Sequence, residues 1–362
     1  MAFPEGRIRA WLEEKEEALS PYAARGRMSK GRERPEAPCP YRTPYQVDRD
    51  RVLASKAFRR LMRKTQVFIA PLGDHYMTRL THTLEVTQLA RAVTRALNLN
   101  EDLAEAVALS HDLGHTPFGH LGEQVLTELV TGGFRHNRQS VRVVEKLENK
   151  GQGLNLSWEV RQGILRHSKG REGIEGKANP AIDTLEAQTV KICDALSYVN
   201  HDLEDAYRAG ILKPEDVPDR YVAALGRDRS QRFQTLLADL VQHSWAASGQ
   251  APVPDGEFPS MRMGPEVREA ANGLRDFLFE RVYLPLGKTP QAERARDILR
   301  RLFDYFVNRP QSIPEGYTTG DDPVQMAVDY ISGMTDRYAL LTAEQVWPGI
   351  SAGMQTEVPT PV

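Results

Sequence analysis

The sequence has 362 residues, 40% of them hydrophobic and 27% charged, which is typical of a globular protein that buries a large core. No apolar run approaches the ~20 residues that a membrane-spanning helix needs. The N-terminus carries no apolar signal core, so we expect a cytoplasmic protein with no membrane partner. Two cysteines, Cys39 and Cys193, make neither a disulfide framework nor a zinc-ribbon spacing, which fits a reducing compartment. The net charge of −2 excludes polyanion binding driven by bulk charge.

Basic residues are concentrated between positions 21 and 64, where thirteen lysines and arginines face four acidic residues. A local basic excess in a nearly neutral protein suggests a phosphate group nearby. For any single one of these residues, a solvated helix face or a flexible loop is the simpler interpretation.

Apolar residues at helical spacing run through most of the chain. They predict helices over residues 48–66, 78–98 and 101–113, and Gly114 ends the third. The pattern recurs over residues 119–131, 137–148, 156–167, 182–209, 229–244, 265–282, 290–307 and 322–341. A short hairpin near residues 67–77 is the one candidate for strand structure. Residues 245–264 read as a long surface loop.

These patterns predict an all-α protein with three parts. Residues 1–46 form an N-terminal helix and a basic irregular arm, residues 47–345 form a single domain, and residues 346–362 form a frayed tail.

The histidines carry the chemical signal, because six of the nine fall between positions 75 and 136. The strongest string is SHDLGHTPFGH at residues 110–120, in which His111 and Asp112 are adjacent at a predicted helix end. Both side chains can reach a metal ion beside the helix terminus. A hydrolytic metal site requires neutral imidazoles, carboxylates and an open position for water.

Two polar residues interrupt apolar helices elsewhere. His82 lies between Leu80 and Leu84, and Asp194 lies within the apolar run VKICDAL. Buried polar groups need partners, and a shared metal would satisfy both residues. Either residue alone is more often a hydrogen-bonded core residue, but the order His, His-Asp, Asp is a specific signal.

This ordered set resembles the HD superfamily of phosphohydrolases. Further strings are similar to its deoxynucleoside triphosphate triphosphohydrolase branch, and the resemblance runs from about residue 42 to residue 341. The strings lie at residues 55–68, 79–83, 111–123, 135–140, 163–168, 194–202 and 329–337.

The resemblance implies an HD-domain helical phosphohydrolase fold with additional C-terminal helices. It also implies one divalent metal ion per site, Mn²⁺ or Mg²⁺ first, although ligand softness also suits Fe, Co, Ni or Zn. The residues that would hold this ion are His82, His111, Asp112 and Asp194.

The resemblance also assigns roles around the metal. His115 would handle protons at the scissile phosphate, Glu123 would orient it, and His120 and His136 would act on the phosphate side. The implied substrate contacts are Arg79 to phosphate, Gln66 to the sugar, and Tyr198 with Asp202 to the 3′-hydroxyl.

Helical spacing independently places Asp194, Tyr198 and Asp202 on one face. The alternative is that Tyr198 and Asp202 belong to a solvated stripe. A structural or surface position is the better interpretation for the remaining histidines, His75, His167, His201 and His243.

The resemblance implies hydrolysis of deoxynucleoside triphosphates, by water attack at the α-phosphorus, to a deoxynucleoside and inorganic triphosphate. It further implies a homo-oligomer, often a hexamer, with nucleotides as effectors and single-stranded nucleic acid as a further partner. Two alternatives stay open. One is an HD hydrolase of another nucleotide, such as a 5′-nucleotidase or phosphodiesterase. The other is a nucleotide-sensing or nucleic-acid-binding protein with weak hydrolase activity.

Overall fold

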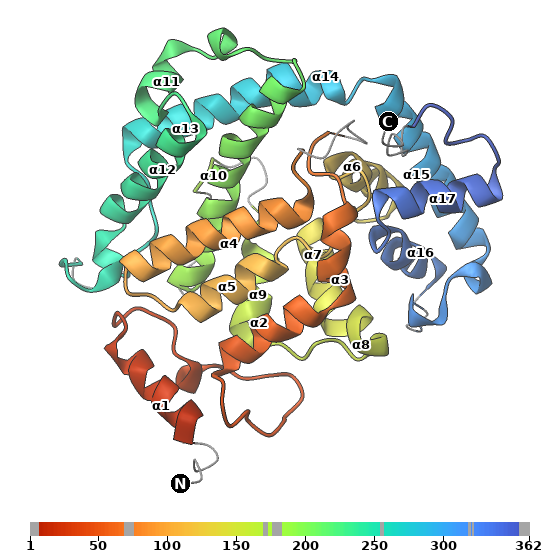
Figure 1. Ribbon diagram of the computed structural model, residues 1–362. Helices are drawn as coiled ribbons and strands as arrows, with labels where there is room; N and C mark the ends of the chain where they lie inside the picture. Colours follow the sequence, from red (N-terminus) through yellow and green to blue (C-terminus); the bar gives the residue numbers. More distant parts are fainter. Residues whose placement is uncertain are drawn as a thin grey trace, which may run out of the picture. The chain divides into compact units, whose positions relative to one another are not determined.

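The computed structural model describes residues 7–68, 76–168, 173–175, 183–253, 257–317, 320 and 322–354. Within these ranges the regular elements are helices (Figure 1). The extended pairs are isolated antiparallel bridges, Arg32 with Ser157 and Thr65 with Thr78. The predicted all-α fold is therefore confirmed.

The chain forms two compact units that alternate along the sequence. Unit 1 comprises Met1–Ala54, Thr83–His111 and Leu154–Leu278, and unit 2 comprises Ser55–His82, Asp112–Gly153 and Phe279–Val362. The division passes between His111 and Asp112, which one peptide bond joins. The boundaries predicted at residues 46 and 345 stay a prediction.

Unit 1 is organised around its longest helix, α10, which contacts four other helices of the unit. Figure 1 shows α10 in green beside α13. Thr184 caps the start of α10, because its hydroxyl accepts a hydrogen bond from the Ala187 backbone N–H at 3.1 Å. The helices of this unit are α1 (Arg7–Lys15), α2 (Pro44–Ala54), α5 (Glu101–Ser110), α9 (Trp158–Arg166), α10 (Leu185–Arg208), α11 (Asp219–Leu225), α12 (Arg229–His243), α13 (Pro265–Leu278) and most of α4 (Arg79–Ala96).

The irregular arm that follows α1 is bound to unit 1 through its backbone. Glu186 accepts a hydrogen bond from the Ala24 N–H at 3.0 Å, and Glu16 accepts one from the Gly26 N–H at 2.6 Å. Glu159 likewise accepts one from the Lys30 N–H at 2.8 Å. Because buried carboxylates satisfy these N–H groups, residues 24–30 of the arm are bound to the unit, whereas residues 33–38 are exposed.

Several arginines of the basic stretch form ion pairs with acidic residues of unit 1. Ion pairs join Arg27 to Glu13 (3.2 Å), Arg42 to Asp50 (2.6 Å), Arg51 to Glu36 (2.8 Å) and Arg49 to Glu105 (3.3 Å). Such pairs add little stability at a surface. They offset part of the positive charge that the sequence suggested, because Glu13 and Glu105 lie outside the basic stretch.

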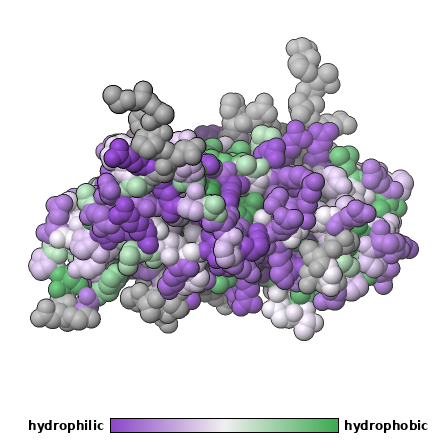
Figure 2. Space-filling view, turned by 90° about the horizontal axis from the view of Figure 1, so that it is seen from below, coloured by the Kyte–Doolittle hydropathy of each residue, from purple (hydrophilic) through white to green (hydrophobic). Residues whose placement is uncertain are grey.

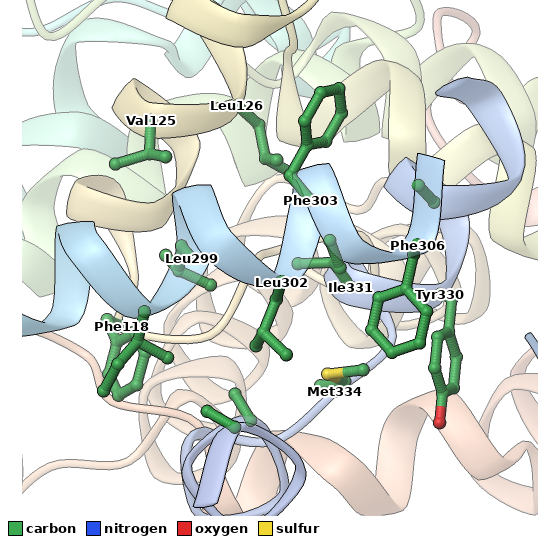
Figure 3. Close-up of a cluster of buried hydrophobic side chains, with 14 of the residues drawn as sticks. Phe118, Val125, Leu126, Leu299, Leu302, Phe303, Phe306, Tyr330, Ile331 and Met334 are labelled. Atoms are coloured by element: carbon green, nitrogen blue, oxygen red, sulfur yellow. The ribbon is translucent and has the colours of Figure 1, made fainter. Parts of the chain in front are cut away.

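Unit 2 has a core between α6 and the C-terminal helices. Phe118, Leu126, Leu302 and Ile331 are buried together in this core, which Figure 3 shows around α15. Helix α15 contacts α6, α16 and α17. The helices of this unit are α3 (Lys56–Arg60), α6 (His120–Leu129), α7 (His136–Arg142), α8 (Glu148–Gly151), α14 (Leu284–Leu286), α15 (Pro290–Asn308), α16 (Pro323–Ser332) and α17 (Asp336–Val346).

A buried ion pair ties α7 to α16 inside unit 2. Arg142 donates to Asp329 through Nε at 2.7 Å and through Nη2 at 2.6 Å. Asp329 is fully buried and also accepts a hydrogen bond from Gln139 at 2.9 Å. A carboxylate can be buried in this way only when its charge and lone pairs are satisfied.

Two predicted helices are interrupted by capping residues. The helix predicted over 48–66 breaks at Ser55, whose hydroxyl accepts a hydrogen bond from the Phe58 N–H and starts α3. The helix predicted over 322–341 ends at Ser332, and Thr335 caps a separate α17. Apolar periodicity continues across both breaks, so the pattern alone did not reveal them.

Two non-helical segments were also predicted. The residues from 69 to 75 lie outside the described part of the chain, so the hairpin near 67–77 stays a prediction, with the bridge between Thr65 and Thr78 flanking it. Residues 245–264 were predicted to form a surface loop. The structure differs, because Met261 and Met263 are buried in unit 1.

The face shown in Figure 2 is mostly hydrophilic, with hydrophobic residues scattered across it. Among the helices in the described ranges, none has the length and apolar character to cross a membrane.

Candidate active site

The segment SHDLGHTPFGH leaves the end of α5 and leads into α6. Gly114 lets it pack directly on the first turns of α7, because a Cβ at Gly114 would lie 2.2 Å from the Ser140 nitrogen and 2.6 Å from the His136 oxygen. The Gly114 N–H also donates to the Ser140 hydroxyl at 2.8 Å. A glycine is therefore required here for close approach, and this approach brings His115 and His136 together.

Asp112 is the centre of the polar cluster in unit 2. Its Oδ2 accepts a hydrogen bond from Arg79 Nη1 at 2.7 Å and lies 4.0 Å from His82 Nε2. Its Oδ1 lies 3.2 Å from His115 Nε2. All four side chains are buried, and both Arg79 and His82 come from the first turn of α4. A predicted metal-ligand pair and two predicted catalytic or phosphate-binding groups are thus brought together.

A second pair of imidazoles continues this cluster. The rings of His115 and His136 stack with centroids 4.0 Å apart and planes at 14°. Glu123 lies 2.9 Å from His136 Nδ1 and accepts a hydrogen bond from the His136 backbone N–H at 2.9 Å. It also lies 3.5 Å from Nδ1 of His120, whose side chain is 61% exposed. The carboxylate predicted to orient His115 therefore contacts His136 directly, and it reaches His115 only through the stacked ring.

The environments of the two stacked histidines push their pKa values apart. Burial and the Arg79 guanidinium lower the pKa of His115, and the Asp112 carboxylate only partly opposes them. Burial also lowers the pKa of His136, but the charge and hydrogen bonds of Glu123 outweigh it and raise that pKa. Burial raises the pKa of Glu123, but the positive charge of His136 and the histidine hydrogen bonds bring it well below its usual range. At neutral pH, His115 is therefore neutral and His136 can be cationic, a division typical of acid–base sites.

His111 lies in unit 1, at the end of α5. Its Nδ1 lies 2.6 Å from the Ala108 carbonyl oxygen, and because that oxygen can only accept, Nδ1 donates this hydrogen bond. Its Nε2 lies 3.7 Å from Asp194 Oδ1. The predicted pair His111 and Asp194 is thus brought together by α5 and α10.

His167 is a neighbour of this pair that sequence reasoning set aside. It is buried at the end of α9, and its ring meets the His111 ring edge-on with centroids 5.0 Å apart. Its Nδ1 lies 2.7 Å from the Ile164 carbonyl oxygen. Its place in the string GILRHS, one of the strings that carry the family resemblance, was the available signal.

The donor chemistry of these residues suits a divalent metal ion. Within unit 2, His82 and Asp112 offer an imidazole and a carboxylate. Within unit 1, His111 and Asp194 offer the same two kinds of donor. In unit 2, ligand atoms of Asp112, His115 and His136 also lie within 4.8 Å of one another. The ring stacking of His115 and His136 and the bond of His136 to Glu123 favour proton and phosphate chemistry for that second group.

The remaining predicted substrate residues lie on α10 and before α4. Asp202 is buried, with its Oδ1 2.7 Å from His201 Nδ1, so it does not belong to a solvated stripe. The Tyr198 ring lies 5.7 Å from the His201 ring. Gln66 in unit 2 is 2% exposed, and among the described residues neither its amide oxygen nor its amide nitrogen has a hydrogen-bond partner. A buried amide of this kind is suited to a polar ligand.

Lys64 is a buried residue beside this cluster that was not assigned a role from the sequence. Its Nζ donates to the Ser332 carbonyl at 2.7 Å and to the His115 carbonyl. Burial, together with the nearby charges of Arg60 and Arg79, lowers the pKa of Lys64 from 10.5 to about 7.

This lowered pKa predicts a pH-dependent stability. Between about pH 7 and pH 10.5 the unfolded chain binds a proton at Lys64 that the folded protein does not bind. The free energy of unfolding should therefore rise with pH by roughly 1.4 kcal/mol per pH unit in that window, and this contribution is lost as pH falls toward 7. Urea unfolding at pH 7.5 and at pH 9.5 should show this rise in the unaltered protein and not in Lys64→Met. Equal slopes for the two proteins would contradict the assignment.

Comparison with known families agrees with this geometry. Residues 79–199 match the family described as HD domain, and residues 261–345 match the family described as phosphohydrolase-associated domain. The protein is thus an HD-domain hydrolase with a histidine–aspartate cluster that could hold a divalent metal.

Similar proteins of known description assign the chain to a narrower family. A deoxyguanosinetriphosphate triphosphohydrolase-like protein of Caldanaerobacter subterraneus subsp. tengcongensis is 49% identical, covering 94% of this chain and 96% of the relative. Proteins with the same description are 44% identical in Desulfatibacillum aliphaticivorans (94% of this chain, 98% of the relative) and 47% identical in Clostridium perfringens (86% and 88%). The chain belongs to this deoxyguanosinetriphosphate triphosphohydrolase-like family, as the sequence resemblance predicted. A solved structure of a hypothetical protein from Aquifex aeolicus, 16% identical, aligns with a TM-score of 0.46 over 82% of this chain and 67% of its own.

Proposed function

We propose that this protein hydrolyses deoxynucleoside triphosphates to a deoxynucleoside and inorganic triphosphate, with water attacking the α-phosphorus. The observation that carries the proposal is the buried cluster in which neutral His115 touches Asp112 and stacks on His136, which Glu123 holds. This cluster supplies a proton carrier next to a metal-ligand carboxylate, as phosphoryl hydrolysis requires. The descriptions of the relatives support a nucleoside triphosphate as the substrate class.

His82, His111, Asp112 and Asp194 are proposed to hold one divalent ion, Mn²⁺ or Mg²⁺, with Fe, Co, Ni or Zn also compatible with these donors. His82 Nε2 lies 4.0 Å from Asp112 Oδ2 in unit 2, and His111 Nε2 lies 3.7 Å from Asp194 Oδ1 in unit 1. When bound, such an ion polarises a phosphoryl oxygen and lowers the pKa of a water molecule.

The residues around this ligand set are proposed to transfer a proton and to bind the triphosphate. His115 moves a proton at the scissile phosphate, since its pKa keeps it neutral and its Nδ1 has no hydrogen-bond partner among the described residues. His136, whose pKa Glu123 raises, and Arg79 offset negative charge on the triphosphate. His120, which is exposed at the start of α6, is proposed to contact phosphate from the solvent side.

Three residues are proposed to recognise the sugar. Gln66 offers a buried amide with both a donor and an acceptor, and Tyr198 and Asp202 offer a phenol and a carboxylate one helical turn apart on α10. Nucleotide effectors, a homo-oligomer such as a hexamer, and single-stranded nucleic acid remain predictions from the family resemblance. The ion pairs of the basic stretch weigh against nucleic-acid binding as the main function.

Product analysis tests the proposed reaction. Each of the four deoxynucleoside triphosphates is incubated alone and in mixture, with Mn²⁺ and with Mg²⁺, and the products are identified by mass spectrometry. We expect a deoxynucleoside and intact triphosphate. Release of orthophosphate or pyrophosphate would instead support an HD hydrolase acting on another bond. Nucleic-acid binding without any hydrolysis would support the sensing alternative.

A further inference from the structure

We propose that Asp336, at the start of α17, is a positioning residue for the active site. It holds the turn after His115 against the segment that carries Gln66. The inference rests on the proposed function and adds a residue from the C-terminal helices to it. All the contacts that carry it lie within unit 2.

Asp336 joins two segments that are far from it in sequence. Its Oδ1 accepts a hydrogen bond from the Phe118 backbone N–H at 2.9 Å. Its Oδ2 accepts one from the Thr65 backbone N–H at 2.9 Å and another from the Thr65 hydroxyl. One carboxylate thus satisfies two backbone donors and one hydroxyl, an arrangement that fixes both segments at once.

The turn that Asp336 holds has an unusual backbone. Phe118 and Gly119 both have a φ of 59°. A positive φ at a bulky aromatic residue costs free energy and persists only where surrounding contacts impose it. The Phe118 ring is buried in the unit 2 core, where Figure 3 shows it with Leu299 and Leu302 of α15. Its ring and its N–H are therefore both constrained, the latter by Asp336.

The turn at Phe118 and Gly119 packs closely on residues 65 and 66, and the Asp336 carboxylate holds the two segments in this position. A Cβ at Gly119 would lie 3.1 Å from the backbone carbonyl oxygen of Gln66 and 3.0 Å from Arg79 Nη2. Lys64 adds a parallel link, because its Nζ donates to both the Ser332 and His115 carbonyls. Residues 332–336 therefore contact both the segment of residues 64–66 and the turn at Phe118. The Ser332 carbonyl accepts from Lys64, and the Asp336 carboxylate accepts from Thr65 and Phe118.

The consequence is that Asp336 sets the positions of two groups that it does not touch. His115 lies three residues before Phe118, and Gln66 directly follows Thr65. When asparagine replaces the carboxylate, all three donors lose a charged acceptor and at least one of them faces an amide nitrogen in place of an oxygen. The turn can then relax toward an ordinary backbone. A misplacement of about 1 Å at a catalytic group can cost about 100-fold in rate.

The test is a steady-state comparison of Asp336→Asn with the unaltered protein, using a deoxynucleoside triphosphate and following triphosphate release. We expect kcat to fall by about 10- to 100-fold, because His115 is displaced. We expect KM to rise by roughly tenfold, because Gln66 is displaced as well. KM does not depend on the fraction of folded enzyme, so a residue that only stabilised the fold would leave it unchanged.

The matched control is Asp322→Asn at the start of α16. Asp322 is exposed and caps its helix by accepting a hydrogen bond from the Gln325 N–H at 2.9 Å, so it repeats the chemical change away from the cluster. This variant should keep both kinetic constants. If Asp336→Asn also keeps both, the inference is overturned.

Two variants of Thr65 test the inference if Asp336→Asn does not fold. Thr65→Val removes only the hydroxyl donor to Asp336, whereas Thr65→Ser keeps it. The valine variant should raise KM and the serine variant should restore it, and equal KM values for the two would overturn the inference. A failure of the proposed function is distinguishable, because the unaltered protein would then release no triphosphate.

Discussion

Asp112→Asn is expected to lower kcat/KM by at least about 10³-fold and to abolish tight binding of Mn²⁺. Asp112 faces His82, Arg79 and His115 at once, and asparagine keeps its shape while removing its charge. The variant also leaves the buried Arg79 guanidinium opposite a neutral amide. Breaking a buried pair in this way costs roughly 3–5 kcal/mol of stability.

Calorimetric titration with Mn²⁺ and steady-state hydrolysis measure the two effects separately. Asp228→Asn is the matched control, because Asp228 is exposed and only caps α12 by accepting a hydrogen bond from the Gln231 N–H at 2.8 Å. The control should retain activity and metal binding. An Asp112→Asn protein that binds Mn²⁺ as tightly as the unaltered chain would remove Asp112 from the ligand set.

His115→Gln is expected to lower kcat by about 10²- to 10⁴-fold while Mn²⁺ binding is retained. Glutamine can still donate a hydrogen bond toward Asp112, but it cannot carry a proton at neutral pH. The loss should appear mainly in kcat, because the substrate contacts proposed for Gln66 and Arg79 are not altered. This separation of chemistry from metal binding distinguishes His115 from the four proposed ligands.

The control for this variant is His243→Gln. The His243 side chain is 43% exposed and contacts Asp239 in unit 1, whereas His115 and the side chains that it contacts belong to unit 2. Its activity should match that of the unaltered protein. If His115→Gln hydrolysed the substrate at the full rate, the proton carrier would have to be sought elsewhere, with His136 the first candidate.

Local patterns predicted the parts of the site that lie within one element. His111 and Asp112 are adjacent in sequence, and Tyr198 and Asp202 share one helix, so no long-range information was needed to group them. The all-α fold followed from apolar periodicity, because most helices are amphipathic and bury one face. The breaks at Ser55 and Thr335 were missed, since a hydroxyl cap can interrupt a helix without changing the apolar period.

Contacts between distant segments could not be predicted from such patterns. Asp336 meets Thr65 across 271 positions, and Lys64 meets Ser332 across 268. The contact of Glu123 with His136 has the same origin, because it depends on Gly114 allowing α7 to approach. Nothing in the local sequence of Glu123 indicates which of three nearby histidines it will hold.

The most direct test of the central claim is hydrolysis of a deoxynucleoside triphosphate in water labelled with heavy oxygen, followed by mass spectrometry of both products. Attack at the α-phosphorus breaks the bond between phosphorus and the 5′ oxygen, so the label should enter the triphosphate and the deoxynucleoside should stay unlabelled. Label in the deoxynucleoside, or release of labelled orthophosphate or pyrophosphate, would contradict the account.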